Sequence, residues 1–181
     1  SCEYDAAISA WMGHRQAGRF AETIRLTFTG GTPLRYGENP HQRAALYRDP
    51  AAAGPSIAGA GVLGGKALSY NNILDATAAL ELSLDLRAIA EGRAVSAVIK
   101  HTNPCGAATG DSIAEAFQRA WKGDPLAAFG SVVVLGGSVD ADAASAIVDG
   151  SRFLEVLVAD RFSPEAASIL SERWPSARLV E

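Results

Sequence analysis

The chain has 181 residues, with 16 Lys and Arg against 20 Asp and Glu and a net charge of −4. It is long enough to bury one full hydrophobic core, and its 48% apolar and 20% charged residues are typical of a folded globular protein, not of a disordered or membrane-spanning chain. The charges are spread without blocks, so neither nucleic acid nor an anionic membrane is expected as a partner. The two cysteines, Cys2 and Cys105, lie far apart, which argues against a disulfide framework and favours a reducing, cytoplasmic setting.

The first fifty residues are predicted to form a lead-in helix, two short strands and a polar loop. Residue spacing predicts a helix over 5–17 and strands over 24–29 and 44–47. The loop, residues 34–42, crowds Arg35, Tyr36 and other hydrogen-bonding side chains around Gly and Pro. This composition is typical of a binding loop, but a polar surface turn has the same composition.

A long helix is predicted after an irregular connection over 51–65. It should begin with Asn71 or Asn72 as its cap, carry Asp75 in its first turn and end near Glu91. Its main apolar stripe is expected at Ile73, Thr77, Leu80 and Leu84. Leucines outside this stripe make the helix apolar around much of its circumference, which predicts burial on more than one side.

The remainder of the chain alternates between strands and helices. Strands are predicted over 95–99, 131–135, 153–159 and 178–180, and helices over 112–122, over 140–148 and from Pro164 onward. Such alternation predicts an α/β protein with three α/β/α layers and a mostly parallel sheet, crossed right-handedly.

The strand over 95–99, expected to be parallel and buried, leads directly into Lys100 and His101. Asn103, Pro104 and Gly106 then force the backbone to turn. An imidazole can accept a proton near neutral pH, and a neighbouring ammonium stabilises developing negative charge, so the pair suits general acid–base catalysis. A Lys-His pair at the start of a solvated loop is the alternative explanation.

Cys105 follows Pro104, as in part of the zinc-deaminase motif. Those enzymes need a second cysteine three residues later, where this chain has Ala108, and a His-x-Glu sequence that this chain lacks. We therefore expect no metal site and interpret Cys105 as a small turn residue. Gly59, Gly61 and Gly64 have the spacing of a glycine-rich dinucleotide loop, but no predicted strand precedes them, so we do not interpret them as one; Walker-type loops and serine nucleophile elbows are missing from the sequence.

Four segments in order carry a specific resemblance: residues 34–42, 65–76, 99–108 and 124–130. They resemble successive motifs of the bifunctional purine-biosynthesis family that joins 5-aminoimidazole-4-carboxamide ribonucleotide (AICAR) transformylase to inosine monophosphate cyclohydrolase. By this resemblance residues 1–32 are a lead-in helix and connection from an absent cyclohydrolase domain. Residues 33–181 are the first half of the transformylase domain, with a cytidine-deaminase-like fold. Because the chain begins without Met and almost directly on a helix, we expect it to be part of a longer polypeptide.

The resemblance also implies an activity. The family transfers a formyl group from 10-formyltetrahydrofolate to the amine of AICAR in de novo purine biosynthesis, without a metal. Its second half-domain carries an essential Asn and most of the folate site, so this chain is expected to supply half of a site and to work as a homodimer or with a complementary chain. A non-catalytic nucleotide-binding or assembly module is the alternative function.

The resemblance assigns roles to seven positions. Lys100 and His101 match the family's catalytic pair, and the positions that match its substrate contacts are Arg35, Tyr36, Asn72, His101, Gly130 and Glu155. One of these is difficult to reconcile with a parallel sheet. Gly130 precedes its strand whereas His101 follows its own, so the two should lie a strand length apart unless residues 123–130 fold over the end of the sheet.

Overall fold

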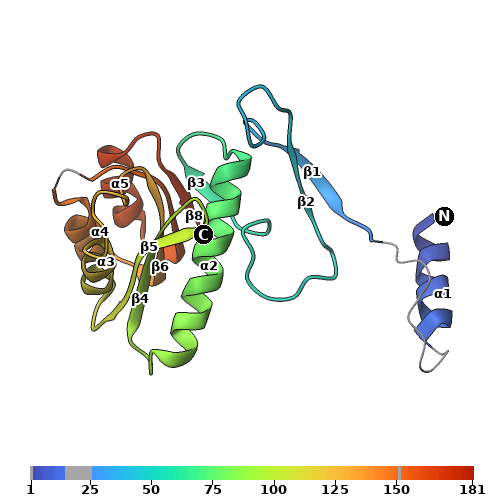
Figure 1. The fold of residues 1–181 in the computed structure, drawn as a ribbon, viewed down its shortest axis with the longest axis horizontal. Coiled ribbons are helices and arrows are strands. Elements are labelled where there is room, and N and C mark those ends of the chain that lie inside the picture. Colours follow the sequence, from blue (N-terminus) through green and yellow to red (C-terminus); the bar gives the residue numbers. More distant parts are fainter. Residues whose placement is uncertain (1, 15–25, 151) are drawn as a thin grey trace.

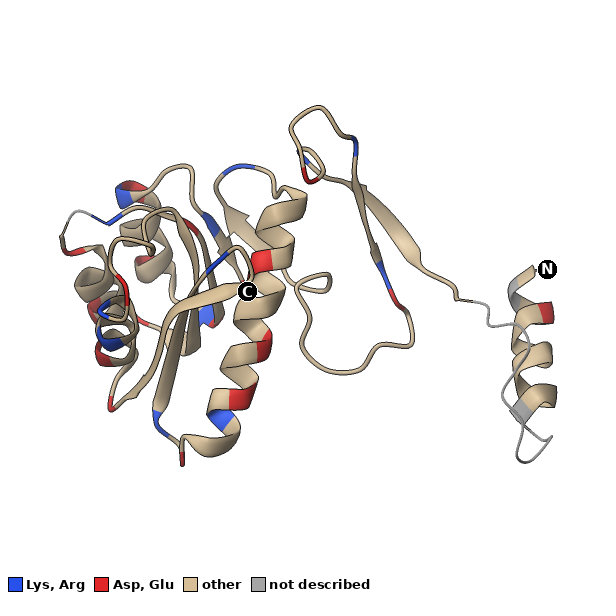
Figure 2. Ribbon diagram, in the orientation of Figure 1, with Lys and Arg blue, Asp and Glu red and all other residues tan. Residues whose placement is uncertain are grey.

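The computed structural model describes residues 2–14, 26–150 and 152–181 (Figure 1). Helix α1 spans Cys2–His14, which confirms that the lead-in helix exists but corrects its start from residue 5 to Cys2; the end predicted at residue 17 lies outside the described residues. None of the helices in the described ranges is both long and apolar enough to cross a membrane. Acidic and basic residues are interspersed over the elements of the fold (Figure 2).

An arm of two antiparallel strands, β1 (Thr29–Pro33) and β2 (Ala45–Arg48), extends away from the larger sheet (Figure 1). The strand predicted over 44–47 is confirmed as β2. Of the strand predicted over 24–29, residues 24 and 25 lie outside the described residues, residues 26–28 are irregular, and only Thr29 is in a strand, as the first residue of β1. Pairing with β2 sets the bounds of β1, and the exposed ring of Tyr47 on β2 lies over Gly31, 2.8 Å from where a Cβ atom would stand.

The larger sheet has six strands in the order β3-β8-β7-β6-β4-β5. Their bounds are Val62–Gly64 (β3), Ala94–Lys100 (β4), Asn103–Gly110 (β5), Ser131–Val139 (β6), Leu154–Phe162 (β7) and Arg178–Val180 (β8). Strands β6, β7 and β8 are mutually parallel, as expected, and β5 runs in the same direction. Strands β3 and β4 run the opposite way, so the sheet is mixed.

Strand β4 is antiparallel to both of its neighbours, which corrects the parallel orientation predicted for it. The segment after His101 is also not an extended loop, because Asn103–Gly110 forms β5 and pairs with β4 along its whole length. A turn of two residues can join only antiparallel strands, so the short connection between Lys100 and Asn103 determines this orientation.

Helices cover both faces of the sheet, giving the predicted three α/β/α layers. Helix α2 (Tyr70–Ile89) packs on one face, where Ala76 and Ala79 contact a cluster of strand valines. Helices α3 (Ile113–Trp121), α4 (Ala141–Val148) and α5 (Pro164–Arg173) pack on the other face around a larger core. The structure thus confirms the helices predicted after residue 111, each preceded by a side chain that caps it.

Helix α2 begins earlier than predicted. Ser69 caps it: the Asn72 backbone N–H donates to the Ser69 hydroxyl, and the Ser69 N–H donates to the Asn72 side chain. This start leaves the first turn without an acidic residue and puts Asp75 in the second. The predicted apolar stripe is only partly right: Ile73 and Leu80 are half-buried and pack against the core, but the fully buried positions are Asn72, Ala76, Ala79 and Ser83. The side chains that face the sheet are small, so the helix axis can approach the sheet closely. Leu84 does not face the sheet and is 38% exposed.

Candidate active site

The β4–β5 hairpin carries the predicted catalytic pair at its tip. Lys100 pairs with Asn103, and the two residues between them, His101 and Thr102, have φ angles of 53° and 61°. Two consecutive positive φ angles are typical of the tightest hairpin turns, in which Asn and Gly are the preferred residues. For other residues the left-handed conformation costs about 1–2 kcal/mol each, so this turn needs support from its surroundings.

Hydrogen bonds hold the turn from two sides. The Thr102 backbone N–H donates to the Asp75 carboxylate on α2 at 2.8 Å. The Asn103 amide donates to the carbonyl oxygen of His101 at 2.8 Å, and the Thr102 hydroxyl donates to the same oxygen at 2.7 Å. The side chain of His101 is exposed at the tip, where a ligand can reach it.

Gly130 lies at the same end of the sheet as Lys100. Because β4 and β6 are antiparallel, with Ile99 opposite Val132, the end of β4 meets the beginning of β6. The Lys100 ammonium donates to the carbonyl oxygen of Phe129 at 2.9 Å. Gly130 has a φ angle of 75°, and its backbone N–H donates to the carbonyl oxygen of Phe153 at 2.8 Å. Gly130 and His101 are therefore not a strand length apart, as a parallel β4 would have required, and residues 123–130 need not fold over the sheet end to bring them together.

A second group of polar side chains joins α2 to strands β7 and β8. The Asn72 amide donates to the Glu155 carboxylate at 3.0 Å. Arg178, only 4% exposed, donates to the carbonyl oxygens of Lys66 and Ala67 at 3.0 and 3.1 Å, and its guanidinium lies 3.8 Å from the Glu155 carboxylate. Burial lowers the pKa of Arg178 below its usual value, and the negative charge of Glu155 opposes this shift.

Arg178 was not among the site residues predicted from sequence. A lone cation in a short apolar strand, Arg178–Val180, is the signal that could have drawn attention to it, because arginine is seldom fully buried without partners.

The loop predicted to bind a ligand is tied to the start of α2. The Arg35 backbone N–H donates to the carbonyl oxygen of Leu68 at 2.9 Å, and the Tyr70 backbone N–H donates to the carbonyl oxygen of Tyr36 at 3.1 Å. The guanidinium of Arg35 lies 5.3 Å from the centre of the Tyr36 ring, and Arg35 is exposed to solvent. Arg35 also contributes to lowering the pKa of Arg178, which puts the two cations in the same electrostatic neighbourhood.

The amino-terminal half of α2 links these groups. Asn72 contacts Glu155, and Asp75, three residues later on the helix, contacts the His101–Thr102 turn. Residues three apart lie on adjacent turns of one helix face, so the Arg35 and Glu155 side and the Lys100 and Gly130 side are joined through a single rigid element.

Cys105, the residue nearest to a metal-ligand motif, lies on β5. Burial and the negative charge of Asp124 raise the pKa of its thiol, which favours the protonated form, and a protonated thiol is a poor nucleophile and metal ligand. Among the residues that the structure describes, no three or more His, Cys, Asp or Glu side chains are grouped so that they could hold a metal ion.

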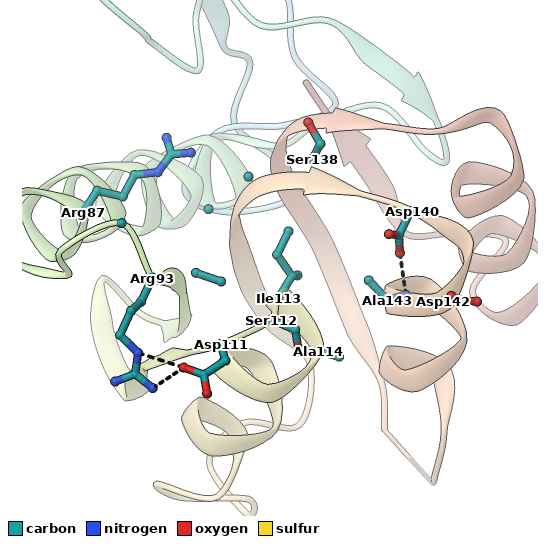
Figure 3. Close-up of a pocket in the computed structure, with 14 residues that line it drawn as sticks. Arg87, Arg93, Asp111, Ser112, Ile113, Ala114, Ser138, Asp140, Asp142 and Ala143 are labelled. Carbon is teal, nitrogen blue, oxygen red and sulfur yellow. Dashed lines mark hydrogen bonds and ion pairs between the residues drawn. The ribbon is translucent and has the colours of Figure 1, made fainter.

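A cavity of about 730 Å³ lies at the opposite end of the sheet, near the beginning of β4 (Figure 3). The amino-terminal ends of α3 and α4 line it, together with Arg87, Arg93 and Asp111. Arg93 and Asp111 point toward each other in Figure 3 and form an ion pair at 3.0 Å. A smaller cavity of about 330 Å³ lies under the loop that contains Ile57. The predicted site residues line neither cavity.

Comparison with known proteins decides the family. The whole chain, residues 1–181, matches the family described as the AICARFT/IMPCHase bienzyme. The chain belongs to this family. The resemblance carried by the four sequence motifs is thereby confirmed.

Relatives in the family are similar along almost the entire chain. The bifunctional purine biosynthesis protein PurH of Rhodopirellula baltica is 45% identical over 182 residues, which cover 98% of this chain and 34% of that protein. PurH of Myxococcus xanthus is 44% identical over 179 residues, covering 98% and 34%, and PurH of Anoxybacillus flavithermus is 44% identical over 170 residues, covering 94% and 32%. The chain spans about a third of the length of these relatives.

Proposed function

We propose that this chain supplies the Lys-His and nucleotide-binding half of an AICAR transformylase site. The reaction transfers a formyl group from 10-formyltetrahydrofolate to the amine of AICAR during de novo purine biosynthesis. Membership of the family supports this proposal. The observation that carries it is the antiparallel β4–β6 pairing, which brings Lys100, His101 and Gly130 to the end of the sheet where Asn72 contacts Glu155.

The proposed chemistry needs a base and a cation. The AICAR amine attacks the formyl carbon, a new C–N bond forms, and the bond from that carbon to the folate nitrogen breaks. His101 removes the proton that the amine loses, and Lys100 stabilises the negative charge on the formyl oxygen. The Lys100 ammonium has three N–H donors, so it can keep its hydrogen bond to Phe129 and still donate to substrate.

Nucleotide binding is assigned to the residues around the start of α2. Arg35 is exposed, and its planar fork suits a phosphate group, while Tyr36 offers a ring or a hydroxyl. Asn72 and Arg178 both contact the same oxygen of Glu155, and no described residue bonds to the other carboxylate oxygen, which can accept a hydrogen bond from a ligand. In this proposal residues 33–181 form the first half of the transformylase domain and residues 1–32 lead into it.

The alternative function is a non-catalytic nucleotide-binding or assembly module. Exposed apolar side chains favour a partner under either function: Ile89 on α2 is 76% exposed, and Leu126 and Phe129, next to Gly130, are 89% and 57% exposed. Leu126 and Phe129 lie in the segment beside Lys100, whereas Ile89 ends α2 at the other end of the sheet, and exposed apolar side chains next to a candidate site favour an interface there. In the transformylase proposal, a complementary half-domain or the second subunit of a homodimer covers these side chains.

Complementation distinguishes the two functions. The chain is mixed with a separately produced segment that carries the remainder of a family transformylase domain, and AICAR-dependent formyl transfer from 10-formyltetrahydrofolate is measured. Formyl transfer by the mixture, and by neither part alone, is the expected result. AICAR binding by the chain without formyl transfer in the mixture contradicts the proposal and favours the module.

A further inference from the structure

The turn between β4 and β5 is unusual in its residues as well as in its conformation. His101 and Thr102 both have positive φ angles, and Thr102 is β-branched, a type of residue that seldom adopts them. Conformations of this kind persist only where the surrounding structure holds them, and they cluster at functional sites. Two kinds of hydrogen bond act on this turn: local ones, whose partners move with it, and one that ties it to another element.

Two of these hydrogen bonds are local. The Thr102 hydroxyl and the Asn103 amide both donate to the His101 carbonyl oxygen, so donors and acceptor lie within three consecutive residues. Such bonds stabilise the shape of the turn, but they do not fix its place relative to the rest of the molecule.

Asp75 provides the anchor. Its carboxylate accepts the Thr102 backbone N–H at 2.8 Å from a position 27 residues earlier in the chain. Asp75 stands on α2 beside Ala76, which is 0% exposed and packs against the sheet, so the acceptor belongs to a rigid element. An ionised acceptor also makes a shorter and stronger hydrogen bond than a neutral one. Among the residues that the structure describes, no other element forms a hydrogen bond to His101 or Thr102.

We propose that Asp75 is a positioning residue, which holds the His101–Thr102 turn in its left-handed conformation and so determines where the His101 imidazole lies. This inference rests on the function proposed above, in which His101 moves a proton. Because Asp75 acts on the backbone of the turn and not on the nucleotide, its loss should reduce kcat for formyl transfer and leave KM for AICAR unchanged. A displacement of about 1 Å at a catalytic group can cost about 10²-fold in rate.

The kinetic test uses an active assembly that contains this chain. Asp75→Ala removes the acceptor, and we expect kcat to fall about tenfold to hundredfold. Asp75→Asn keeps an oxygen acceptor without the charge and should restore part of the loss. Thr102→Gly in the Asp75→Ala background should also restore part of it, because glycine adopts positive φ without support. Asp85→Ala, an exposed position on the same helix, is the matched control.

A second measurement does not depend on activity. Amide hydrogen exchange at Thr102, followed by NMR in the 181-residue chain, should become faster in Asp75→Ala and stay unchanged in Asp85→Ala. Unchanged exchange at Thr102 in Asp75→Ala overturns the inference. So does a reduced affinity for AICAR with kcat intact, since Asp75 would then be a binding residue.

Failure of the proposed function can be recognised separately. If His101→Ala retains formyl transfer, the catalytic role of His101 is wrong, and the role of Asp75 in catalysis falls with it. Hydrogen exchange at Thr102 still decides whether Asp75 anchors the turn. If His101→Ala abolishes formyl transfer while Asp75→Ala keeps full kcat, the proposed function stands and the positioning role of Asp75 is overturned.

Discussion

The two ends of the six-stranded sheet differ in how they treat polar groups. At the end that carries Lys100 and His101, polar groups are held in costly states: His101 and Thr102 are left-handed, and Arg178 is buried. At the other end a single non-glycine residue among those described, Glu91, is left-handed, with a φ angle of 52°, and the charged groups pair at the surface. Arg93 and Asp111 form an ion pair whose side chains are 43% and 85% exposed.

The large cavity lies away from the His101–Thr102 turn and from buried Arg178, which make their end of the sheet the more strained one. The 730 Å³ cavity belongs to the end with exposed ion pairs and capped helices, whereas the predicted site residues gather at the strained end. Strained backbone and buried charges need a compensating role, and functional sites are where they concentrate. Concavity alone would have selected the end opposite to the proposed site. A site that another half-domain completes is expected to stay open in this chain, which fits the proposed function.

The largest effect is expected at the strained end. His101→Ala should abolish formyl transfer in an assembly containing this chain while AICAR affinity persists, because His101 is proposed to move a proton. Removing a general base costs about 10²–10⁴ in rate. Single-turnover formylation and AICAR binding are measured side by side. A loss confined to affinity contradicts the assignment and makes both ends of the sheet equal candidates again.

The second effect concerns stability at the same end. Arg178→Met should lower the free energy of unfolding by about 2 kcal/mol, because the carbonyl oxygens of Lys66 and Ala67 lose their donor and Glu155 loses a neighbouring cation. Urea unfolding of the chain measures this change. Arg173→Met, whose guanidinium is bonded only to the carbonyl oxygen of Gly150 among the described hydrogen bonds, is the matched control. An equal loss of unfolding free energy in both variants would show that buried Arg178 contributes no more to stability than an exposed arginine.

Local sequence signals predicted most of the helices and several strands. Ser112 and Ser163 cap α3 and α5 because a serine hydroxyl can satisfy a free backbone N–H at a helix start, and these signals lie within four residues of the structure that they specify. Strand β5 carried the opposite signal. Asn103, Pro104 and Gly106 are poor strand residues, and only pairing with β4 makes the segment extended.

The hairpin was missed for a related reason. The usual sequence signature of a two-residue turn is Asn-Gly or Asp-Gly, and here His101 and Thr102 occupy those positions. Without the hairpin, β4 was predicted to be parallel, and Gly130 was predicted at the wrong end. The fold was therefore predicted least well at the candidate site, where function competes with local preference.

Within the site, motifs and fold contribute different residues. The family motifs supplied Lys100, His101 and the nucleotide contacts, whose roles stay predictions. Asp75 and Arg178 were not assigned roles, because each acts through a backbone group that is distant in sequence: 27 residues for Asp75 to Thr102 and 111 for Arg178 to Ala67. Only the folded sheet brings such pairs together.

The smallest effect is expected at the end with the large cavity. Arg93→Ala removes the ion pair to Asp111 and a hydrogen bond to Thr109. Because both charged groups are largely exposed, water replaces most of what is lost, and the free energy of unfolding should change by less than about 1 kcal/mol. Formyl transfer and AICAR affinity should stay at the level of the unmodified protein, since Arg93 comes just before β4 and Lys100 ends that strand, so the whole strand separates them. The same assembly serves for both measurements, with His101→Ala as the inactive reference. A clear fall in formyl transfer in Arg93→Ala would mean that the 730 Å³ cavity takes part in the reaction, and the contrast between the two ends of the sheet would then no longer locate the site.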